Sequence, residues 1–222
     1  MNNTQTPFPA IDSLLMLEGP EGPLEVQVEW PDADQTAIAA TAIVCHPLPT
    51  GGGTKDNKVV TTAAKAFRAL GMPSVRFNFR GTGKSAGAFD NGIGEVADLM
   101  AVVEWVRATR PNTTLWLAGF SFGSYVSLSS IGLSRPDYLV SIAPPAGRWD
   151  FDALVRPGMP WLVVQGEADE LVDANVTKQW FDQLKAPQAR YVSMPETSHF
   201  FHGKLIDLRE AILAWAADVR RA

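Results

Sequence analysis

The 222-residue sequence predicts a single-domain α/β fold with a mostly parallel central sheet. Short apolar segments of strand length alternate with longer segments of helical periodicity, and this alternation is typical of βαβ units with helices on both faces of the sheet. The chain length suits one domain around one sizeable core. A Gly-x-Ser-x-Gly pentapeptide also lies where one strand passes directly into a helix.

The expected strands are short apolar runs bounded by turn-forming residues. The first two are joined by the turn-rich residues 19–23, and we expect them to form an antiparallel hairpin at the N-terminal edge of the sheet. The eight expected strands comprise residues 13–18, 24–30, 37–45, 74–79, 114–118, 138–143, 160–165 and 190–194.

The expected helices follow most of the later strands, and their apolar residues recur at helical spacing. They comprise residues 58–70, 94–108, 124–131, 174–184 and 204–220. Residues 144–159, between the sixth and seventh strands, are too few for a second domain or a cap domain. They leave room for one short helix around residues 149–154. The whole chain, 1–222, is therefore expected to form one domain.

Composition excludes several classes of protein. A net charge of −5 argues against a nucleic-acid partner, and no segment is apolar over the length needed to cross a bilayer. The first nine residues lack the basic and apolar regions of a secretory signal. Cys45 is the only cysteine, which excludes an intrachain disulfide and a multi-cysteine metal site and fits a small buried hydrophobe. We therefore expect a cytoplasmic protein without membrane contact.

The pentapeptide from Gly119 to Gly123 carries the strongest chemical signal in the chain. A serine on so tight a strand-to-helix turn is held in a strained backbone conformation that exposes its hydroxyl above the sheet. The two glycines are needed because side chains at their positions would collide as the strand and the helix approach each other. The pattern predicts Ser121 as a catalytic nucleophile, and the alternative is a tight structural turn.

A serine hydroxyl needs a base beside it, and the base needs a third group that fixes its tautomer. The chain has three histidines. We predict His199 as the base, because it lies in a loop after the last strand, and sites in parallel sheets form at the carboxyl ends of strands. His202 is the substitute, with a surface role expected. We expect the ring of His46 to bond the backbone of its own loop.

Four acidic side chains follow the seventh strand and compete for the third role: Glu167, Asp169, Glu170 and Asp173. We predict Asp169, because the spacing Asp-x-x-Val lets Val172 pack inward while the carboxylate faces the loop. Asp169 could instead cap the next helix, but Asp173 is better placed for that. The chain order Ser121, Asp169, His199 is the order of nucleophile, acid and base associated with this turn.

A tetrahedral oxyanion needs two hydrogen-bond donors. One is expected from the amide of Phe122, directly after the serine. The other is expected from the loop His46-Pro47-Leu48-Pro49, in which the prolines have no N–H and stiffen the turn around the amide of Leu48. We predict these two amides as the oxyanion hole, and four apolar side chains as the lining of the substrate pocket: Leu48, Phe122, Trp149 and Phe200.

Over nearly its whole length the chain resembles a small α/β-hydrolase. The resemblance rests on five regions: His46-Pro-Leu-Pro, Lys55-Asp-Asn-Lys-Val59, Arg76-Phe-Asn-Phe-Arg80-Gly-Thr-Gly-Lys-Ser85, Gly119-Phe-Ser-Phe-Gly123 and the later acid and base loops. The chain is most similar to the lid-less, esterase-like branch related to dienelactone hydrolases and short-chain carboxylesterases. That branch often has a second histidine where this chain has Leu48, which alters the polarity of the pocket and leaves the backbone donor in place.

The residues and the resemblance together predict a serine hydrolase that cleaves small, short-chain carboxylic esters through a Ser-His-Asp triad and an acyl-enzyme. A small-molecule ester is the expected partner, and no metal or organic cofactor is implied. Larger members of the superfamily carry a cap domain between the sixth and seventh strands, for which this chain has no room. We expect an open site that prefers short acyl chains to long ones.

Several other functions are compatible with parts of the pattern. A thioesterase or a lactone or dienelactone hydrolase would use the same residues. A serine peptidase on this fold usually controls access with an extra domain, which is absent here. A catalytically silent α/β-hydrolase acting as a binding module would be expected to lack a triad member, and none is missing.

The segment Gly81-Thr-Gly-Lys-Ser85 resembles a nucleotide-binding loop. A phosphate loop, however, requires a glycine five residues before Gly83, where Asn78 stands. Residues 87–92 also delay any helix whose N-terminus could meet a phosphate. We expect this segment to form a tight turn after the strand at 74–79 that borders the site.

Overall fold

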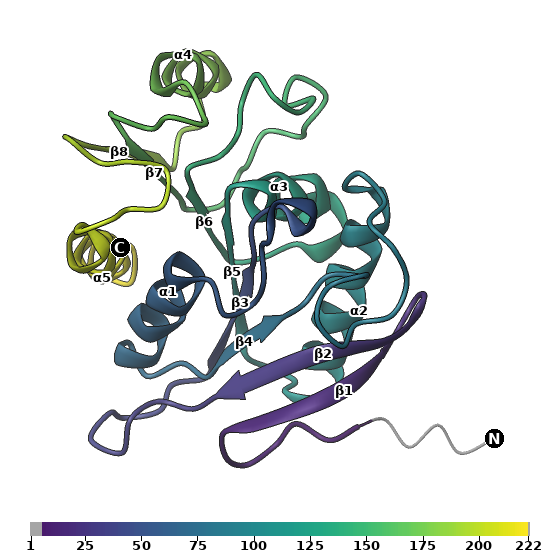
Figure 1. Cartoon of the computed structure of the whole chain (residues 1–222). Helices are drawn as coiled ribbons and strands as arrows, with labels where there is room; N and C mark the ends of the chain where they lie inside the picture. The colour runs from purple at the N-terminus through teal and green to yellow at the C-terminus, as the bar shows by residue number, and fades with distance from the viewer. Residues whose placement is uncertain (1–5, 222) are drawn as a thin grey trace.

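One eight-stranded sheet forms the centre of the computed structural model, which describes residues 6–221 (Figure 1). The expectation about a secretory signal rests in part on residues 1–5, which lie outside the described residues. The strands are β1 (Ser13–Gly19), β2 (Gly22–Glu29), β3 (Ala40–Cys45), β4 (Ser74–Phe77), β5 (Thr114–Phe120), β6 (Tyr138–Ile142), β7 (Trp161–Gly166) and β8 (Ala189–Met194).

The strand order is β1-β2-β4-β3-β5-β6-β7-β8. Strands β3 to β8 pair in parallel, whereas β1 and β2 form an antiparallel hairpin whose second strand pairs antiparallel with β4. The sequence-based prediction of a mostly parallel sheet with an antiparallel N-terminal edge is therefore confirmed. The parallel strands β3 and β7 are buried along their whole length, and β5 is buried after its first residue, which explains why they read as continuous apolar runs.

Five helices cover the two faces of the sheet: α1 (Lys58–Ala69), α2 (Ile93–Thr109), α3 (Phe122–Ser134), α4 (Ala174–Leu184) and α5 (Leu205–Val219). In Figure 1, α1 and α5 lie on one side of the sheet, and α2 and α3 lie on the other. Alternate residues of the strands enter two separate cores. One core is shared with α1 and α5, and the other with α2, α3 and Trp180 of α4.

No helix forms around residues 149–154, where the length of the connection leaves room for one. The connection between β6 and β7 forms turns instead, with backbone bonds from the amide of Arg148 to Pro145 and from that of Leu154 to Phe151. Phe151 is buried and packs edge-on against Trp180, with 4.8 Å between ring centroids. This apolar anchor holds the segment without a helix, and no cap domain lies between the two strands.

The carboxyl ends of the parallel strands meet at one edge of the sheet, where sites form in open α/β sheets. Cys45 at the end of β3 pairs with Gly119 near the end of β5. The loops after β3, β5, β6, β7 and β8 therefore converge, although they are far apart in the sequence. This convergence brings together the residues that the sequence analysis singled out.

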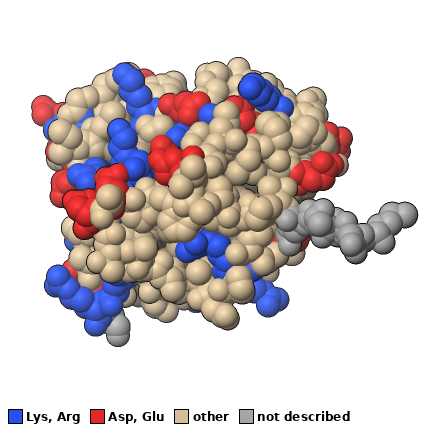
Figure 2. All heavy atoms as spheres, turned by 90° about the horizontal axis from the view of Figure 1, so that it is seen from below, with Lys and Arg blue, Asp and Glu red and all other residues tan. Residues whose placement is uncertain are grey.

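No helix among residues 6–221 has the length and apolar character needed to cross a lipid bilayer. On the face of the molecule shown in Figure 2, acidic and basic side chains lie among one another. Proteins that bind nucleic acid usually present an extended basic patch. The face in Figure 2 shows no such patch.

Candidate active site

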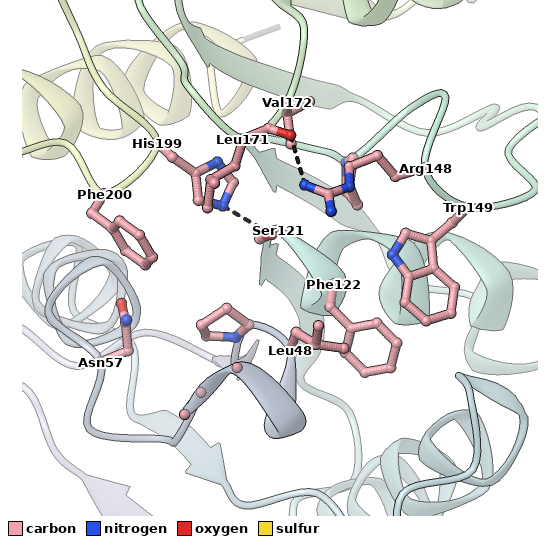
Figure 3. Close-up of a pocket in the computed structure, with 15 residues that line it drawn as sticks. Leu48, Asn57, Ser121, Phe122, Arg148, Trp149, Leu171, Val172, His199 and Phe200 are labelled. Carbon is pink, nitrogen blue, oxygen red and sulfur yellow. Dashed lines mark hydrogen bonds between the residues drawn. The ribbon is translucent and has the colours of Figure 1, made fainter.

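Ser121 is the single residue between β5 and α3. Its backbone lies at φ 52° and ψ −120°, a left-handed conformation that a residue with a side chain rarely adopts. The Ser121 N–H donates to the carbonyl of Ile142 at 2.8 Å, so the neighbouring strand β6 helps to hold this strained backbone. The sharp turn directs the hydroxyl into a cavity at the carboxyl edge of the sheet (Figure 3).

The two glycines of the pentapeptide are required by close backbone approach. A Cβ atom at Gly119 would lie 2.1 Å from the carbonyl oxygen of Gly123, and one at Gly123 would lie 2.4 Å from that of Cys45. At both positions the added Cβ would collide with backbone atoms, which cannot move aside as a flexible side chain can. The Gly-x-Ser-x-Gly pattern is therefore a packing requirement of this turn.

His199 lies in the loop between β8 and α5 and is almost fully buried. Its Nε2 is 3.0 Å from the Oγ of Ser121 (Figure 3). Its Nδ1 is 2.8 Å from Oδ2 of Asp169. A proton on Nδ1 is donated to the carboxylate, which leaves the Nε2 lone pair facing the serine hydroxyl. The backbone N–H of His199 donates to Oε2 of Glu170 at 3.0 Å and fixes the loop.

Asp169 accepts four hydrogen bonds, two on each carboxylate oxygen. Oδ2 accepts from His199 and from the side-chain amide of Gln165 at 2.9 Å, and Oδ1 accepts from the amides of Leu171 and Val172. Burial alone raises the pKa of Asp169, but the hydrogen bonds and the neighbouring imidazole outweigh burial and leave the pKa below its usual value. Asp169 is therefore held as a carboxylate.

Gln165 is a residue of the site that the sequence reading missed. It lies at the end of β7 and is fully buried. The available signal was a single polar residue in an otherwise apolar strand, which needs a buried hydrogen-bond partner. The partner is Asp169: the side-chain amide of Gln165 donates to its carboxylate and so fixes the carboxylate to the end of the strand.

The other three acids near β7 have separate partners. Glu167 accepts from the hydroxyl of Ser193, Glu170 accepts from the backbone of His199, and Asp173 accepts from two amides in the first turn of α4. Asp173 is thus the helix cap that the sequence suggested. Among the four, the structure brings the Asp169 side chain to the imidazole.

The loop after β3 is stiffened by His46, whose ring is fully buried. Nδ1 donates to the carbonyl of Pro47 at 2.6 Å, and Nε2 accepts from the amide of Phe79 at 3.0 Å. Burial lowers the pKa of His46 to about 4, although the bond to Pro47 opposes this shift. The neutral ring therefore joins the loop to the segment just after β4, in agreement with the expected bond to the backbone of its own loop.

Leu48 and Phe122 line the same cavity. Within residues 6–221 neither N–H donates a hydrogen bond to another group of the protein. The carbonyl of Leu48 accepts from the amides of Gly51 and Gly53, which curl the loop into a tight turn.

The cavity beside Ser121 has a volume of about 370 Å³. Its wall includes all four apolar residues named in the sequence analysis (Leu48, Phe122, Trp149 and Phe200). The sequence reading missed several other residues that line it, namely Pro47, Gly51, Gly52, Gly53, Asn57, Pro145, Arg148, Leu171 and Val172. They come from loops whose convergence only the folded sheet determines.

Other candidates lie away from the cavity. His202 is exposed and does not line it, and the thiol of Cys45 is buried, which raises the pKa of Cys45 to about 12. Among residues 6–221 no three His, Cys, Asp or Glu side chains are grouped so that they could hold a metal ion.

The turn at residues 81–85 does not line the cavity, so the expectation that it borders the site was wrong. The amide of Lys84 donates to the carboxylate of Glu25 at 2.9 Å, and the hydroxyl of Ser85 donates to the carbonyl of Asn78. The turn folds back onto the hairpin of β1 and β2, so the Lys84 amide, which a phosphate would need as a donor, is already bonded to the carboxylate of Glu25 in β2.

The strand order, the strained serine after the central strand β5 and the surrounding helices are those of an α/β-hydrolase. Comparison with known proteins agrees. Residues 23–158 match the model of the X-Pro dipeptidyl-peptidase family (S15 family). The chain belongs to this family, within the α/β-hydrolase superfamily, and is a hydrolase by that membership.

Two solved structures are similar along almost the whole chain. An α/β serine hydrolase without a lid from Xanthomonas campestris is 56% identical, with a TM-score of 0.93 and coverage of 98% of this chain and 97% of the other. An α/β serine hydrolase homologue from Coxiella burnetii is 44% identical, with a TM-score of 0.89 and coverage of 93% and 98%.

A relative known by its sequence comes from Rickettsia prowazekii. This uncharacterized protein is 33% identical over 208 residues, which cover 89% of this chain and 86% of the relative. The lid-less neighbour agrees with the absence of a cap domain between β6 and β7.

Proposed function

We propose that this protein is a serine esterase that cleaves small carboxylic esters through an acyl-enzyme on Ser121. The observation that carries the proposal is the continuous line of hydrogen bonds from Asp169 through His199 to Ser121, which ends in the cavity. A serine with a base at hydrogen-bond distance, and a base oriented by a third group, is the arrangement that nucleophilic catalysis needs.

The first half of the reaction acylates the serine. His199 Nε2 takes the proton of Ser121 as Oγ attacks the ester carbonyl carbon. The negative charge on the carbonyl oxygen is stabilised by the amides of Leu48 and Phe122. The tetrahedral intermediate then collapses, the bond to the leaving oxygen breaks, and His199 passes its proton to that oxygen so that an alcohol departs.

The second half repeats these steps with water. His199 takes a proton from a water molecule as its oxygen attacks the acyl carbon, and the same two amides bind the second oxyanion. Collapse breaks the bond to Oγ, which recovers its proton from His199, and a carboxylic acid leaves. Asp169 stays ionised throughout and stabilises the imidazolium, in agreement with its lowered pKa.

The size and openness of the cavity favour small substrates. A volume of about 370 Å³ lies near the lower end of the range of small-molecule sites, and no lid adds apolar surface above it. We therefore expect kcat/KM to be higher for two- to six-carbon acyl chains than for longer ones. A steady rise in kcat/KM out to twelve-carbon esters would contradict this expectation.

The family match makes a peptidase the second candidate. A peptidase that recognises a free amino terminus needs a carboxylate to pair with the ammonium group. No Asp or Glu is among the described residues that line the cavity. The cavity therefore supports an ester better than the amino end of a peptide. A thioester or a lactone would meet the same groups, so the substrate panel must include both.

The proposal is tested by intact mass after treatment with a fluorophosphonate, together with an ester, thioester, lactone and peptide-amide panel. We expect one adduct on the wild type and none on Ser121→Ala. Ser129→Ala is the matched control, because Ser129 lies on α3, which begins directly after Ser121, bonds only the carbonyl of Tyr125 and does not line the cavity. A folded wild type that forms no adduct and cleaves no ester would overturn the proposal and favour a binding module.

A further inference from the structure

One charged side chain in the cavity has no part in the proposed chemistry. Arg148 lies in the loop after β6 and lines the cavity beside Ser121. It is the only Lys, Arg, Asp or Glu among the described residues that do so. A single guanidinium in a small cavity is a specific recognition element, because its N–H groups match the geometry of a carboxylate.

The guanidinium of Arg148 is held in place by a neutral group. Nη1 donates to the carbonyl of Leu171 at 2.8 Å, from the loop after β7 on another side of the cavity (Figure 3). Within residues 6–221 no carboxylate lies within 4.0 Å of it. Arginine has five N–H donors, so one bond to a carbonyl positions the group and leaves most of its donors and its charge for a ligand.

The arrangement of the cavity indicates which part of an ester meets Arg148. His199 must reach the leaving oxygen, so the alcohol part of the substrate lies toward His199. In Figure 3, Phe200 and Asn57 lie on that side of Ser121, whereas Arg148 and Trp149 lie on the opposite side. The acyl chain therefore extends toward Arg148.

We propose that Arg148 binds a carboxylate at the far end of the acyl chain. The preferred substrates are then half-esters of short dicarboxylic acids, which carry one ester group and one free carboxylate. This inference rests on the proposed function and names the substrate class of the same site. Trp149 covers the methylene groups between the two ends, and Arg148 discriminates by charge.

The test compares two substrates that differ only at that end. They are the monoethyl ester of glutaric acid, which is anionic, and the ethyl ester of glutaramic acid, in which a neutral carboxamide replaces the carboxylate. The measured quantity is the ratio of their kcat/KM values, followed by product formation. The succinate and adipate pairs extend the series to shorter and longer spacers.

We expect the wild-type ratio to favour the anionic ester by about tenfold, because hydrogen bonds to charged groups are stronger than neutral ones. Arg148→Gln should bring the ratio to about one. Arg148→Lys should retain part of the preference, because lysine keeps the positive charge but cannot make the two parallel hydrogen bonds of a guanidinium. Raising the salt should shrink the wild-type ratio, because the cavity is open to solvent.

Arg156→Gln is the matched control. Arg156 is exposed in the same connection between β6 and β7 and donates to the carbonyl of Leu184, but it does not line the cavity. Its substitution should leave the ratio as in the wild type. A wild-type ratio near one across all three spacers, or a ratio that Arg148→Gln leaves unchanged, would overturn the inference.

The two proposals fail in different ways. If the protein takes the fluorophosphonate on Ser121 and cleaves neutral esters without an anionic preference, the esterase function stands and the role of Arg148 is wrong. If it takes no fluorophosphonate and cleaves no ester of either kind, the esterase function is wrong, and the inference about Arg148 is overturned with it.

Discussion

The two walls of the cavity are built in different ways. One wall carries Ser121 and His199, and Asp169 lies behind His199. These residues lie at the end of β5 and in the loops after β7 and β8, and each of the three side chains has a fixed partner. The wall formed by the connection between β6 and β7 carries Arg148, which is exposed and has one hydrogen bond, and Trp149, which stacks on Tyr125. The three side chains at the strand ends are thus held by several fixed partners, whereas the proposed recognition residues lie on a loop, where substitutions disturb that geometry least.

Removing the base is the most severe test of the first wall. His199→Ala should lower kcat for a good ester by about 10⁴-fold or more, because the serine loses its only base. His202→Ala is the control, since His202 is exposed three residues further on and does not line the cavity. Steady-state kinetics on both variants make the measurement. Equal losses in the two variants would mean that the imidazole of His199 is not the base.

His46 braces the loop after β3, which carries Leu48. The burial of the His46 ring predicts that the stability of the protein depends on pH. Because burial lowers the pKa of His46 from 6.5 to about 4, the unfolded chain binds a proton in this range that the folded protein does not. The free energy of unfolding should therefore fall by about 3 kcal/mol from this group as the pH drops through that range. His46→Gln lacks this contribution, so its stability should depend less on pH.

Urea titrations of the wild type and of His46→Gln at several pH values across this range test that expectation. The difference in the free energy of unfolding between the two proteins should shrink as the pH falls. The wild type loses the contribution of the neutral His46 ring, whereas glutamine does not titrate. A difference that stays constant over the range would show that His46 is not buried in its neutral form.

Substitution of Gln165 should weaken the positioning of Asp169 without removing a member of the triad. Gln165→Met keeps the length of the side chain but removes a donor to Asp169, so the carboxylate is held less firmly against His199. We expect kcat and the rate of fluorophosphonate labelling to fall together by about tenfold, the cost of one hydrogen bond to a charged group. Ser193→Ala, which removes the partner of Glu167 nearby, should leave both rates close to the wild type.

The smallest effect is expected on the second wall. The indole of Trp149 stacks on Tyr125 at 5.1 Å and lies 4.9 Å from the ring of Phe122. Trp149→Leu removes part of the apolar surface over the acyl chain, so we expect KM for a butyrate ester to rise about threefold. The labelling rate of Ser121 should change much less. A loss of labelling as large as the loss of ester binding would show that the two walls are not independent.

The elements of the fold were predictable because their signals are local. Each strand and helix was found within a few residues of its observed ends, and α4 at its observed ends. Burial on both faces makes parallel strands uniformly apolar, and this can be read without the fold. The conformation of residues 149–154 was not predictable in this way, because Phe151 anchors that segment by a tertiary contact with Trp180, which no local pattern reports.

The sequence by itself determined the strained turn at Ser121, because only two glycines permit the backbone contacts at Gly119 and Gly123. It also gave an order of serine, acid and histidine that identified three candidates for one site. The tertiary structure decided which of four acids faces the imidazole, since that choice depends on the register of β7 against β8 and on the bond from Gln165.

The wall of the cavity was likewise decided by the tertiary structure. Arg148 and Leu171 come from different loops, and their contact at the wall of the cavity follows from the adjacency of β6 and β7 in the sheet. The physical reason is one of range. Backbone strain, capping and apolar periodicity act over a few residues, whereas the composition of a cavity depends on which loops the pairing of distant strands brings to one edge.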